Sequence, residues 1–395
     1  MQHVIIGNGV AGVTAAAELS DREAGQIEVY AAEPYPYYFR PQLPRFLGGG
    51  VSRERLIARS PSWYEERDIV VHLDTPVARL LPDEKRIVLE DGSKVAYDRL
   101  LLATGGLPFI PPIEGQGKEG VFTLRTLEDA LAIKAYAPRC EQAVVIGGGL
   151  LGLESARGLQ GLGLSVTALE FFPRLLPRQL DDEGAAVFRK MVEDLDIGVA
   201  VGANTKAILG DGAVERVVLQ DGREFPAQLV LVATGMRCNA ELAAEAGLTV
   251  DRGVVVDDHL RTSAPDVYAA GDVASFHGRS WGIIPQAREQ AAVAAANMAG
   301  DDAVYEEIVP STTLRIAGIH LTSCGKEPSS EGESWTAYRQ EDPGAGVYRK
   351  LALEEDVAVQ AIVIGDRALA RELEALVTQR ARVSREEAYD LLSIE

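Results

Sequence analysis

The chain carries one sequence unit twice, and this internal repeat limits the folds that it can adopt. Residues 4–9 read VIIGNG and residues 144–149 read VVIGGG, so Gly147 lies 140 residues after Gly7. The two units also end alike, in DGSKVAYDRLLLATG at Gly105 and in DGREFPAQLVLVATG at Gly235. Because a repeat of this kind is one supersecondary unit used twice, we expect two similar domains.

Each unit has the pattern of an α/β domain. The β-branched runs at 4–6 and 144–146 are typical of strands that are buried on both faces of a parallel sheet. The Ala/Leu-rich stretches after the glycines favour helices. Further strands are expected at Ile27–Ala31 and Ser165–Leu169, and the Asp-Gly pairs at 91–92 and 221–222 predict hairpins. The sequence thus predicts an α/β fold with two Rossmann-like domains.

The last part of the chain has a different pattern. A helix is predicted from about Pro285 to Met298, with Pro285 in the first turn, where its missing N–H does no harm. Beyond Tyr305, strands are expected at 312–318, 347–353 and 357–364, and helices at 366–379 and 384–392. We therefore expect a third, smaller α+β domain at the C-terminal end.

The first glycine-rich turn has the spacing of a dinucleotide-binding motif. In GNGVAG, Gly7 suits the tight turn, Gly9 lets a pyrophosphate approach the backbone, and Gly12 lets the helix pack on the strand. The helix N-terminus then attracts phosphate. Glu33 lies 26 residues after Gly7 and is expected to accept a hydrogen bond from a ribose hydroxyl. The alternative is a plain glycine turn in an α/β sheet.

The second turn repeats the motif with Gly147, Gly149 and Gly152. Glu170 follows Gly147 by 23 residues, and a carboxylate there would accept from a free 2′-hydroxyl and repel a 2′-phosphate. The pattern therefore predicts a second dinucleotide, NADH in preference to NADPH. Arg174 and Arg178 lie nearby and oppose this interpretation, because either side chain could reach a phosphate.

Composition excludes several other function classes. With 39 Lys and Arg against 59 Asp and Glu, the formal net charge is −20, so neither nucleic acid nor an anionic membrane is an expected partner. Cys140, Cys238 and Cys324 lie far apart, which disfavours a disulfide framework, a metal site and a CxxC redox pair. The N-terminus lacks the pattern of a signal peptide, and no apolar run is long enough for a membrane helix. A protein of the reducing cytoplasm is expected.

Taken together, these motifs resemble those of the two-dinucleotide flavoprotein reductases related to the pyridine nucleotide–disulfide oxidoreductases. The resemblance rests on GNGVAG with Glu33, ATGG at 103–106, GGGLLGLE at 147–154, ATGM at 233–236 and YAAGDVA at 268–274. It implies that FAD occupies the first repeat, where Asp272 binds the flavin ribitol, and that NADH occupies the second. It also implies an FAD domain at 1–112 and 240–303, an inserted NADH domain at 113–239 and a C-terminal domain at 304–395.

A closer resemblance lies in EPYPYYFRPQLPRFL at 33–47 and VYRKLALEEDVAVQAIVIGD at 347–366. These segments are similar to NADH:rubredoxin oxidoreductases and the flavin portion of NADH-dependent nitrite reductases, and the first also to ferredoxin reductases of oxygenase systems. Arg40 and Pro41 are implied to shape the flavin pocket, although Arg40 could instead form a surface ion pair. Arg45 replaces the family lysine beside the flavin N5, which keeps the charge but not a readily lost proton.

The same stretch contains no cysteine, unlike the disulfide reductases, the coenzyme A disulfide reductases and the water-forming NADH oxidases. Without a thiol, two-electron thiol chemistry has no nucleophile. The three cysteines are therefore interpreted as small buried hydrophobic residues.

Catalytic roles are implied for Arg45 and Glu154. By resemblance Glu154, expected on the first turn of its helix, faces the flavin N5 region, where it could pair with Arg45; the alternative is a carboxylate that only stabilises the helix N-terminus. Pro285 begins a helix whose N-terminus would face the flavin N1–C2=O edge, unless it only packs in the core. Glu289 and Gln290 resemble a family pair on that helix. The complete set expected to bind cofactor is Gly7, Gly9, Val10, Ala11, Gly12, Glu33, Arg40, Pro41, Arg45, Val77, Ala103, Thr104, Gly105, Gly147, Gly149, Leu150, Leu151, Gly152, Glu170, Gly235, Asp272 and Pro285.

The implied reaction is hydride transfer from NADH to the flavin N5 of FAD, followed by electron delivery to a small one-electron carrier, rubredoxin or ferredoxin. Two alternatives remain open at this point. One is an NADH oxidase that reduces O2 to peroxide, and the other is a flavoprotein that senses NADH. Both a monomer and a homodimer are compatible with the sequence.

Overall fold

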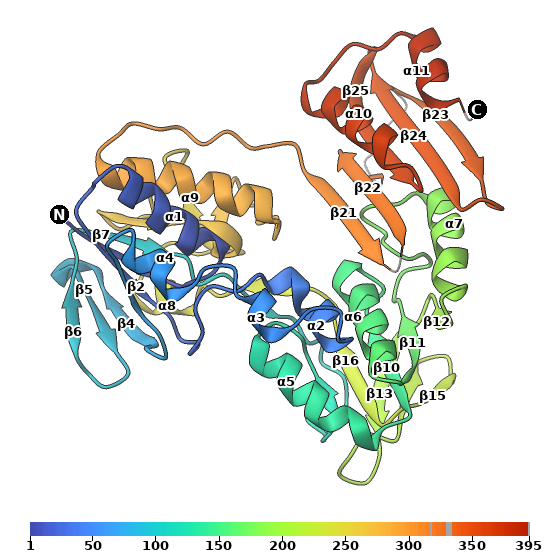
Figure 1. Cartoon of the computed structure of the whole chain (residues 1–395), viewed down its shortest axis with the longest axis horizontal. Coiled ribbons are helices and arrows are strands. Elements are labelled where there is room, and N and C mark those ends of the chain that lie inside the picture. Colours follow the sequence, from blue (N-terminus) through green and yellow to red (C-terminus); the bar gives the residue numbers. More distant parts are fainter. Residues whose placement is uncertain (317, 329–333, 394–395) are drawn as a thin grey trace. The chain divides into compact units, whose positions relative to one another are not determined.

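The computed structural model describes residues 1–316, 318–328 and 334–393 (Figure 1). Contacts divide the chain into two compact units. The first unit comprises Met1–Arg40, Arg53–Leu107 and Met236–Glu307, and the second comprises Pro41–Ser52, Pro108–Gly235 and the chain from Ile308 onward. The domain boundaries implied by the resemblance remain a proposal.

Both units are built on a five-stranded parallel sheet. In the first unit the strand order is β19-β7-β1-β2-β3, and in the second it is β12-β11-β10-β16-β9. The first sheet consists of β1 (Gln2–Ile6), β2 (Gln26–Tyr30), β3 (Ile69–His72), β7 (Arg99–Leu102) and β19 (Val267–Ala269). The second consists of β9 (Val121–Phe122), β10 (Gln142–Ile146), β11 (Ser165–Leu169), β12 (Ile197–Ala200) and β16 (Leu229–Val232).

The register of the strands reproduces the repeat. Ile6, at the end of β1, lies opposite Tyr30 of β2 and Leu102 of β7. In the second unit, Ile146 lies opposite Leu169 and Val232 in the same way. The expected α/β fold with Rossmann-like sheets is confirmed. The units differ in their fifth strand. In the first unit it is β19, which follows the other four strands in the sequence, and in the second unit it is β9, which precedes them.

Helices complete the two units. In the first unit α1 (Val10–Asp21) follows the glycine turn and packs beside α9 (Ile284–Ala299), as Figure 1 shows. In the second unit α6 (Leu150–Gly161) follows the corresponding turn. The remaining helices of the two repeats are α2 (Leu43–Leu47), α3 (Arg53–Leu56), α4 (Pro61–Glu65), α5 (Leu127–Tyr136), α7 (Asp182–Glu193) and α8 (Glu241–Glu245).

Each repeat also carries a three-stranded antiparallel sheet. The first runs β4-β5-β6 and the second β13-β14-β15. Gly92 and Gly222 have φ values of +85° and +89°, so the two Asp-Gly turns form the predicted hairpins. The bounds are β4 (Val77–Leu81), β5 (Arg86–Leu89), β6 (Lys94–Ala96), β13 (Thr205–Leu209), β14 (Arg216–Leu219) and β15 (Glu224–Pro226). Short two-stranded sheets pair β8 (Gly106–Pro108) with β17 (Met236–Cys238) and β18 (Val254–Val256) with β20 (Ala274–Phe276).

The C-terminal part is the expected α+β domain, a five-stranded antiparallel sheet with two helices (Figure 1). Its order is β21-β22-β25-β24-β23. Helix α10 packs on β22 and β25, and α11 packs on β23 and β24. The bounds are β21 (Ser311–Ile316), β22 (Ile319–Gly325), β23 (Trp335–Asp342), β24 (Val347–Glu354), β25 (Val357–Ile364), α10 (Arg367–Thr378) and α11 (Arg385–Leu392). Of the strand predicted at 312–318, Ala317 lies outside the described residues.

The strands predicted for the C-terminal domain include neither β22 nor β23, and one residue of the second repeat was misplaced. Strand β23 forms an edge of the sheet, and its side chains are half-buried or exposed without a regular alternation. It therefore has no apolar periodicity to detect. Glu154 is the fifth residue of α6, on the second turn and not the first, because the helix begins at Leu150, directly after Gly149, and already includes Gly152.

Candidate functional site

The first glycine turn has backbone geometry that only glycine supports. Gly7 has φ +112°, and a Cβ placed on it would lie 2.2 Å from the carbonyl oxygen of Ala103. A Cβ on Gly12 would lie 1.9 Å from the carbonyl oxygen of Gly7. At Gly9, by contrast, a Cβ would meet nothing within 4 Å. Two glycines are thus required by close packing, and the middle one borders open space.

The second turn repeats this geometry residue by residue. Gly147 has φ +123°, and its Cβ would lie 2.3 Å from the carbonyl oxygen of Ala233. The Cβ of Gly152 would lie 2.0 Å from the carbonyl oxygen of Gly147, while the Cβ of Gly149 would meet nothing within 4 Å. The repeat therefore conserves the space beside each middle glycine as well as the turn.

Both open spaces adjoin a helix N-terminus. Gly9 and Gly149 are the N-cap residues of α1 and α6, and neither helix has a side-chain hydrogen bond at its cap. The free N–H groups of the first turn and the helix dipole then favour an anion such as a pyrophosphate. The residues present at both turns fit the phosphates of a dinucleotide.

Glu170 directly follows β11 and closes the second turn. Its side chain is 6% exposed, its Oε2 accepts a 2.7 Å hydrogen bond from the Gly148 N–H, and its Oε1 accepts a 2.9 Å bond from the Phe172 N–H. These bonds hold the carboxylate against the glycine loop. Arg174 is bound elsewhere, to Asp182 at 2.9 Å and to the Leu180 carbonyl at 3.1 Å, which removes one of the two cations that could have favoured a 2′-phosphate.

The expected ribose ligand of the first unit is also held in place. Glu33 accepts a 2.6 Å hydrogen bond from Arg40 through Oε1 and a 2.5 Å bond from the Tyr38 hydroxyl through Oε2. The Arg40 guanidinium lies 5.2 Å from the centre of the Tyr38 ring. The ion pair considered for Arg40 is therefore present, and each carboxylate oxygen keeps a second lone pair for a hydroxyl donor.

Three motifs of the first unit converge at Gly271, the residue before Asp272. Its N–H donates a 2.9 Å hydrogen bond to Gln290 Oε1 on α9, and its φ is +82°. A Cβ there would lie 2.9 Å from the Ala11 side chain on α1 and 3.6 Å from that of Ala287 on α9. The first turns of α1 and α9 and the Gly271-Asp272 motif thus meet in one region.

The structure places Arg45 and Pro41 in the second unit, on the segment Pro41–Ser52. Helix α2 of this segment packs against α6 and α5. A Cβ on Gly158 of α6 would lie 2.4 Å from the Pro44 carbonyl oxygen. Arg45 is exposed and donates a 3.2 Å hydrogen bond to Gln42 Oε1. Its assignment to the flavin pocket remains a prediction.

Glu154 shares the face of α6 that receives α2, because it precedes Gly158 by four residues and Gly161 by seven. Burial raises the pKa of Glu154 to about 7. Among the described residues the structure gives Glu154 no ion pair with Arg45, so the proposed pairing is not formed here. A carboxyl that titrates near neutral pH can hold or release a proton under ordinary conditions.

The remaining predicted residues lie where their motifs put them. In the first unit, Val10 and Ala11 begin α1, Val77 begins β4, Ala103, Thr104 and Gly105 follow β7, Asp272 lies in a 3-10 turn, and Pro285 is the second residue of α9. In the second unit, Leu150 and Leu151 begin α6 and Gly235 follows β16. Thr104 and Thr234 also match: their hydroxyls donate to the carbonyls of Asn239 and Phe109, at 2.7 and 2.6 Å.

One residue of the first turn was missed by the sequence interpretation. Asn8 stands where the second repeat has Gly148, and its Oδ1 accepts a 3.0 Å hydrogen bond from the Tyr64 hydroxyl. Its Nδ2 is buried and has no partner within the described chain. The difference between the two aligned motifs was the available signal.

The cysteines offer no reactive thiolate. All three are free; Cys324 is buried, and Cys140 and Cys238 are half-buried. Burial raises the pKa of each thiol, to about 11 at Cys324. They stay protonated at neutral pH, which agrees with a site that does not use thiol chemistry.

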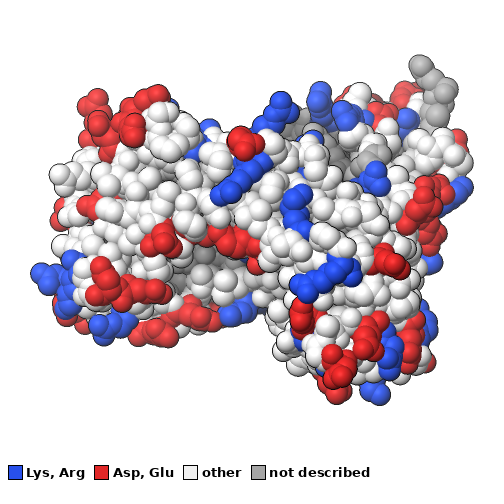
Figure 2. Space-filling model, turned by 60° about the horizontal axis from the view of Figure 1, so that its bottom comes forward, with Lys and Arg blue, Asp and Glu red and all other residues white. Residues whose placement is uncertain are grey.

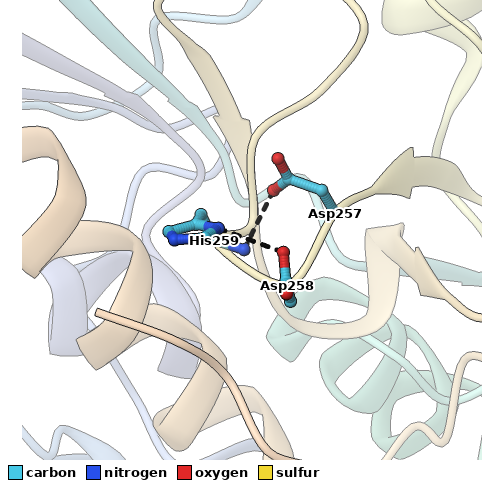
Figure 3. A group of neighbouring side chains, drawn as sticks. All are labelled: Asp257, Asp258 and His259. Carbon is cyan, nitrogen blue, oxygen red and sulfur yellow. Dashed lines mark hydrogen bonds and ion pairs between the residues drawn. The ribbon is translucent and has the colours of Figure 1, made fainter. Parts of the chain in front are cut away.

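A cluster of possible metal ligands lies elsewhere, at Asp257, Asp258 and His259 (Figure 3). Asp257 Oδ1 accepts hydrogen bonds from the backbone N–H groups of His259 and Arg261, at 3.0 and 2.8 Å. The two ring nitrogens of His259 lie 3.0 Å from Asp258 and 3.0 Å from Asp302. The cluster is accounted for as a hydrogen-bonded turn.

Charged side chains on the face in Figure 2 form small groups of both signs, separated by uncharged surface. The net charge of −20 is thus not gathered there into one acidic area. In the described part of the chain, every helix is too short or too polar to span a bilayer.

Comparison with known proteins agrees with this geometry. Residues 1–299 match the family described as pyridine nucleotide-disulphide oxidoreductase, and residues 310–381 match the rubredoxin NAD+ reductase C-terminal domain. NADH-rubredoxin oxidoreductase of Clostridium acetobutylicum is 30% identical over 376 residues, which cover 95% of this chain and 93% of that protein.

A second relative is longer. Nitrite reductase [NAD(P)H] of Bacillus subtilis is 34% identical over 394 residues, which cover 99% of this chain and 49% of that protein. The chain therefore spans about half the length of the first relatives that it matches. Among solved structures, the covalent putidaredoxin reductase–putidaredoxin complex has a TM-score of 0.88 at 28% identity, covering 99% of this chain and 95% of that one.

Proposed function

We propose that this chain, which belongs to the pyridine nucleotide-disulphide oxidoreductase family, is an FAD-dependent NADH oxidoreductase. It passes electrons to a small one-electron carrier protein, and rubredoxin is the first candidate for that carrier. The proposal rests above all on the two matched glycine turns, each with open space beside an uncapped helix N-terminus. Oxidation of one NADH to NAD+ and a proton would supply two electrons, one for each of two carrier molecules.

The residues of the chain have separate tasks in this proposal. Bound flavin would supply the hydride-accepting and one-electron chemistry. The turn at Gly7–Gly12 binds the FAD pyrophosphate, and the turn at Gly147–Gly152 binds that of NADH. Glu170 positions the adenosine ribose and disfavours a 2′-phosphate. Glu154, with its pKa raised to about 7, holds a proton at its carboxyl near neutral pH.

The choice of a carrier protein has support of its own. The C-terminal domain matches the one that is named after rubredoxin reductases, and a relative of nearly the same length is an NADH-rubredoxin oxidoreductase. Because the chain offers no reactive thiol to receive electrons from the flavin, the electrons go to an external acceptor. A reducing compartment such as the cytoplasm suits three free cysteines.

The test is NADH oxidation under argon with rubredoxin, with ferredoxin and with no carrier, compared with the same protein in air. We expect rubredoxin to accelerate turnover under argon by at least tenfold. Fast turnover in air without any stimulation by either carrier would instead identify a peroxide-forming oxidase. If NADH reduces the flavin slowly and no acceptor speeds NADH oxidation, the protein would be identified as an NADH sensor.

A variant separates the two cofactor sites. Gly149→Val puts a side chain into the open space at the second turn, where its Cβ meets nothing within 4 Å, so the protein should fold and keep its FAD but lose reduction by NADH. Dithionite-reduced Gly149→Val should still reduce rubredoxin. Gly117→Val is the matched control, because Gly117 is exposed, has no positive φ and also borders open space.

A further inference from the structure

Helix α9 carries three buried amide side chains on its packed face. Gln286, Gln290 and Asn297 are 3%, 6% and 3% exposed. Gln290 follows Gln286 by four residues, so the two lie on the same face of the helix. A buried amide needs hydrogen-bond partners, since its removal from water is otherwise uncompensated.

Two of the three amides hold a neighbouring backbone segment. Asn297 donates to the carbonyls of His259 and Ala303, at 2.9 and 2.8 Å, and accepts a 2.8 Å bond from the Ala303 N–H. Gln290 Oε1 accepts the 2.9 Å bond from the Gly271 N–H. The Nε2 of Gln286 differs, because it is buried with no hydrogen-bond partner among the described residues.

The residue that carries the unpartnered donor lies one helical turn before Gln290, which binds the Gly271 N–H where the FAD motifs meet. Gln286 precedes Ala287, the α9 residue whose side chain borders Gly271. Gly271 in turn borders Ala11 in the first turn of α1, and Asp272 follows it in the chain. Helix α9 also begins here without a side-chain cap. A buried donor at this point fits an acceptor oxygen that the protein itself does not supply.

We infer that Gln286 is an FAD-binding residue whose Nε2 donates a hydrogen bond to an oxygen of the flavin half of the cofactor. This inference rests on the proposed binding of FAD. The pyrophosphate already has the open space at Gly9 and the N-terminus of α1. An uncharged amide on a different helix suits a carbonyl or hydroxyl oxygen of the isoalloxazine or ribityl group.

The test uses Gln286→Met, which keeps the length of the side chain and removes the donor. FAD titration of the flavin-stripped full-length chain should show a dissociation constant raised about tenfold. The affinity for ADP, which lacks the flavin half, should change less than twofold. Thermal unfolding of the stripped variant should occur at the wild-type temperature or above, because the orphaned donor is gone.

Asn297→Leu is the control, since its amide is satisfied within the protein: unfolding temperatures should fall with and without FAD, and FAD affinity should stay within about twofold. Gln286→Glu keeps the shape of the side chain and should weaken FAD as Gln286→Met does. Unchanged FAD affinity in both Gln286 variants, an equal loss for ADP, or destabilisation of stripped Gln286→Met like that of Asn297→Leu would overturn the inference. Wild-type protein that bound no FAD would overturn the proposed function itself.

Discussion

The Nζ atom of Lys350 lies 2.9 Å from Asp181 Oδ2, and the lysine side chain is fully buried. The Tyr348 hydroxyl donates a 2.6 Å hydrogen bond to the same oxygen, while Asp181 Oδ1 caps α7 by accepting from the Gly184 N–H at 3.1 Å. One carboxylate therefore ties β24 of the C-terminal sheet to α7 of the second repeat. No motif in the sequence predicted this contact.

Asp181→Asn should strongly destabilise the protein. The substitution leaves the buried Lys350 charge without its counter-ion, which typically costs about 3–5 kcal/mol. Urea unfolding followed by circular dichroism measures the loss. Asp182→Asn is the control, because its side chain is 84% exposed and its bond to Arg174 is a surface ion pair, worth about 0–1 kcal/mol. Equal, small losses in both variants would show that the buried pair contributes little.

The same carboxylate should make the protein sensitive to acid. Burial by itself raises the pKa of Asp181, but the hydrogen bonds from Tyr348 and Lys350 outweigh it and hold the pKa below its usual value. Its stabilising effect is thus complete above the ordinary pKa of about 3.9 and is lost as the pH falls through the lowered value. Below pH 4, wild type should lose stability faster than Asp181→Asn, as acid titration of the circular dichroism signal would report.

Glu154 should have the opposite pH dependence. Because burial raises its pKa to about 7, the folded state favours the neutral acid, and this stability is lost as the pH rises through 7. Glu154→Gln should therefore gain about 1–2 kcal/mol relative to wild type between pH 5 and pH 8, since each pH unit is worth at most about 1.4 kcal/mol. Urea unfolding at both pH values tests this, with exposed Glu141→Gln as the control. A difference independent of pH would contradict the raised pKa.

Glu170 should set the preference for NADH. Its buried carboxylate, fixed by the N–H groups of Gly148 and Phe172, would repel a 2′-phosphate. We expect kcat/KM for NADH to exceed that for NADPH by at least tenfold, and Glu170→Gln to reduce this ratio. Arg178→Ala is the comparison, because Arg178 is the exposed cation of the same loop that could reach a 2′-phosphate, and its loss should not reduce the ratio. A wild-type preference for NADPH would refute the assignment.

Gly158→Ala tests the packing of α2 on α6. Alanine usually stabilises a helix by about 1 kcal/mol relative to glycine. Here its Cβ would lie 2.4 Å from the Pro44 carbonyl oxygen, and such overpacking costs about 1–3 kcal/mol. We expect a net loss of stability in thermal unfolding, whereas Arg157→Ala, on the exposed side of α6, should change little. A Gly158→Ala variant that is more stable than wild type would show that α2 can move away from α6 at little cost.

Much of the fold was accessible from local sequence signals. The turns at Gly7 and Gly147 were predicted because a positive φ and close strand–helix packing admit only glycine. The C-terminal strands β24 and β25 were found by their apolar runs. Strand β23 was not, because it forms a largely exposed edge of its sheet.

The sequence by itself determined the two repeats, their matched dinucleotide turns and the absence of a thiol from the motif stretch. These features depend on backbone conformation and on neighbours within a few residues. Only the tertiary structure decided that the segment of Arg45 packs on α6 through Gly158, that Lys350 is buried against Asp181, and that Gln286 lacks a partner. Each of these depends on close approach between residues far apart in the chain, and burial then determines the strength of the charges and hydrogen bonds.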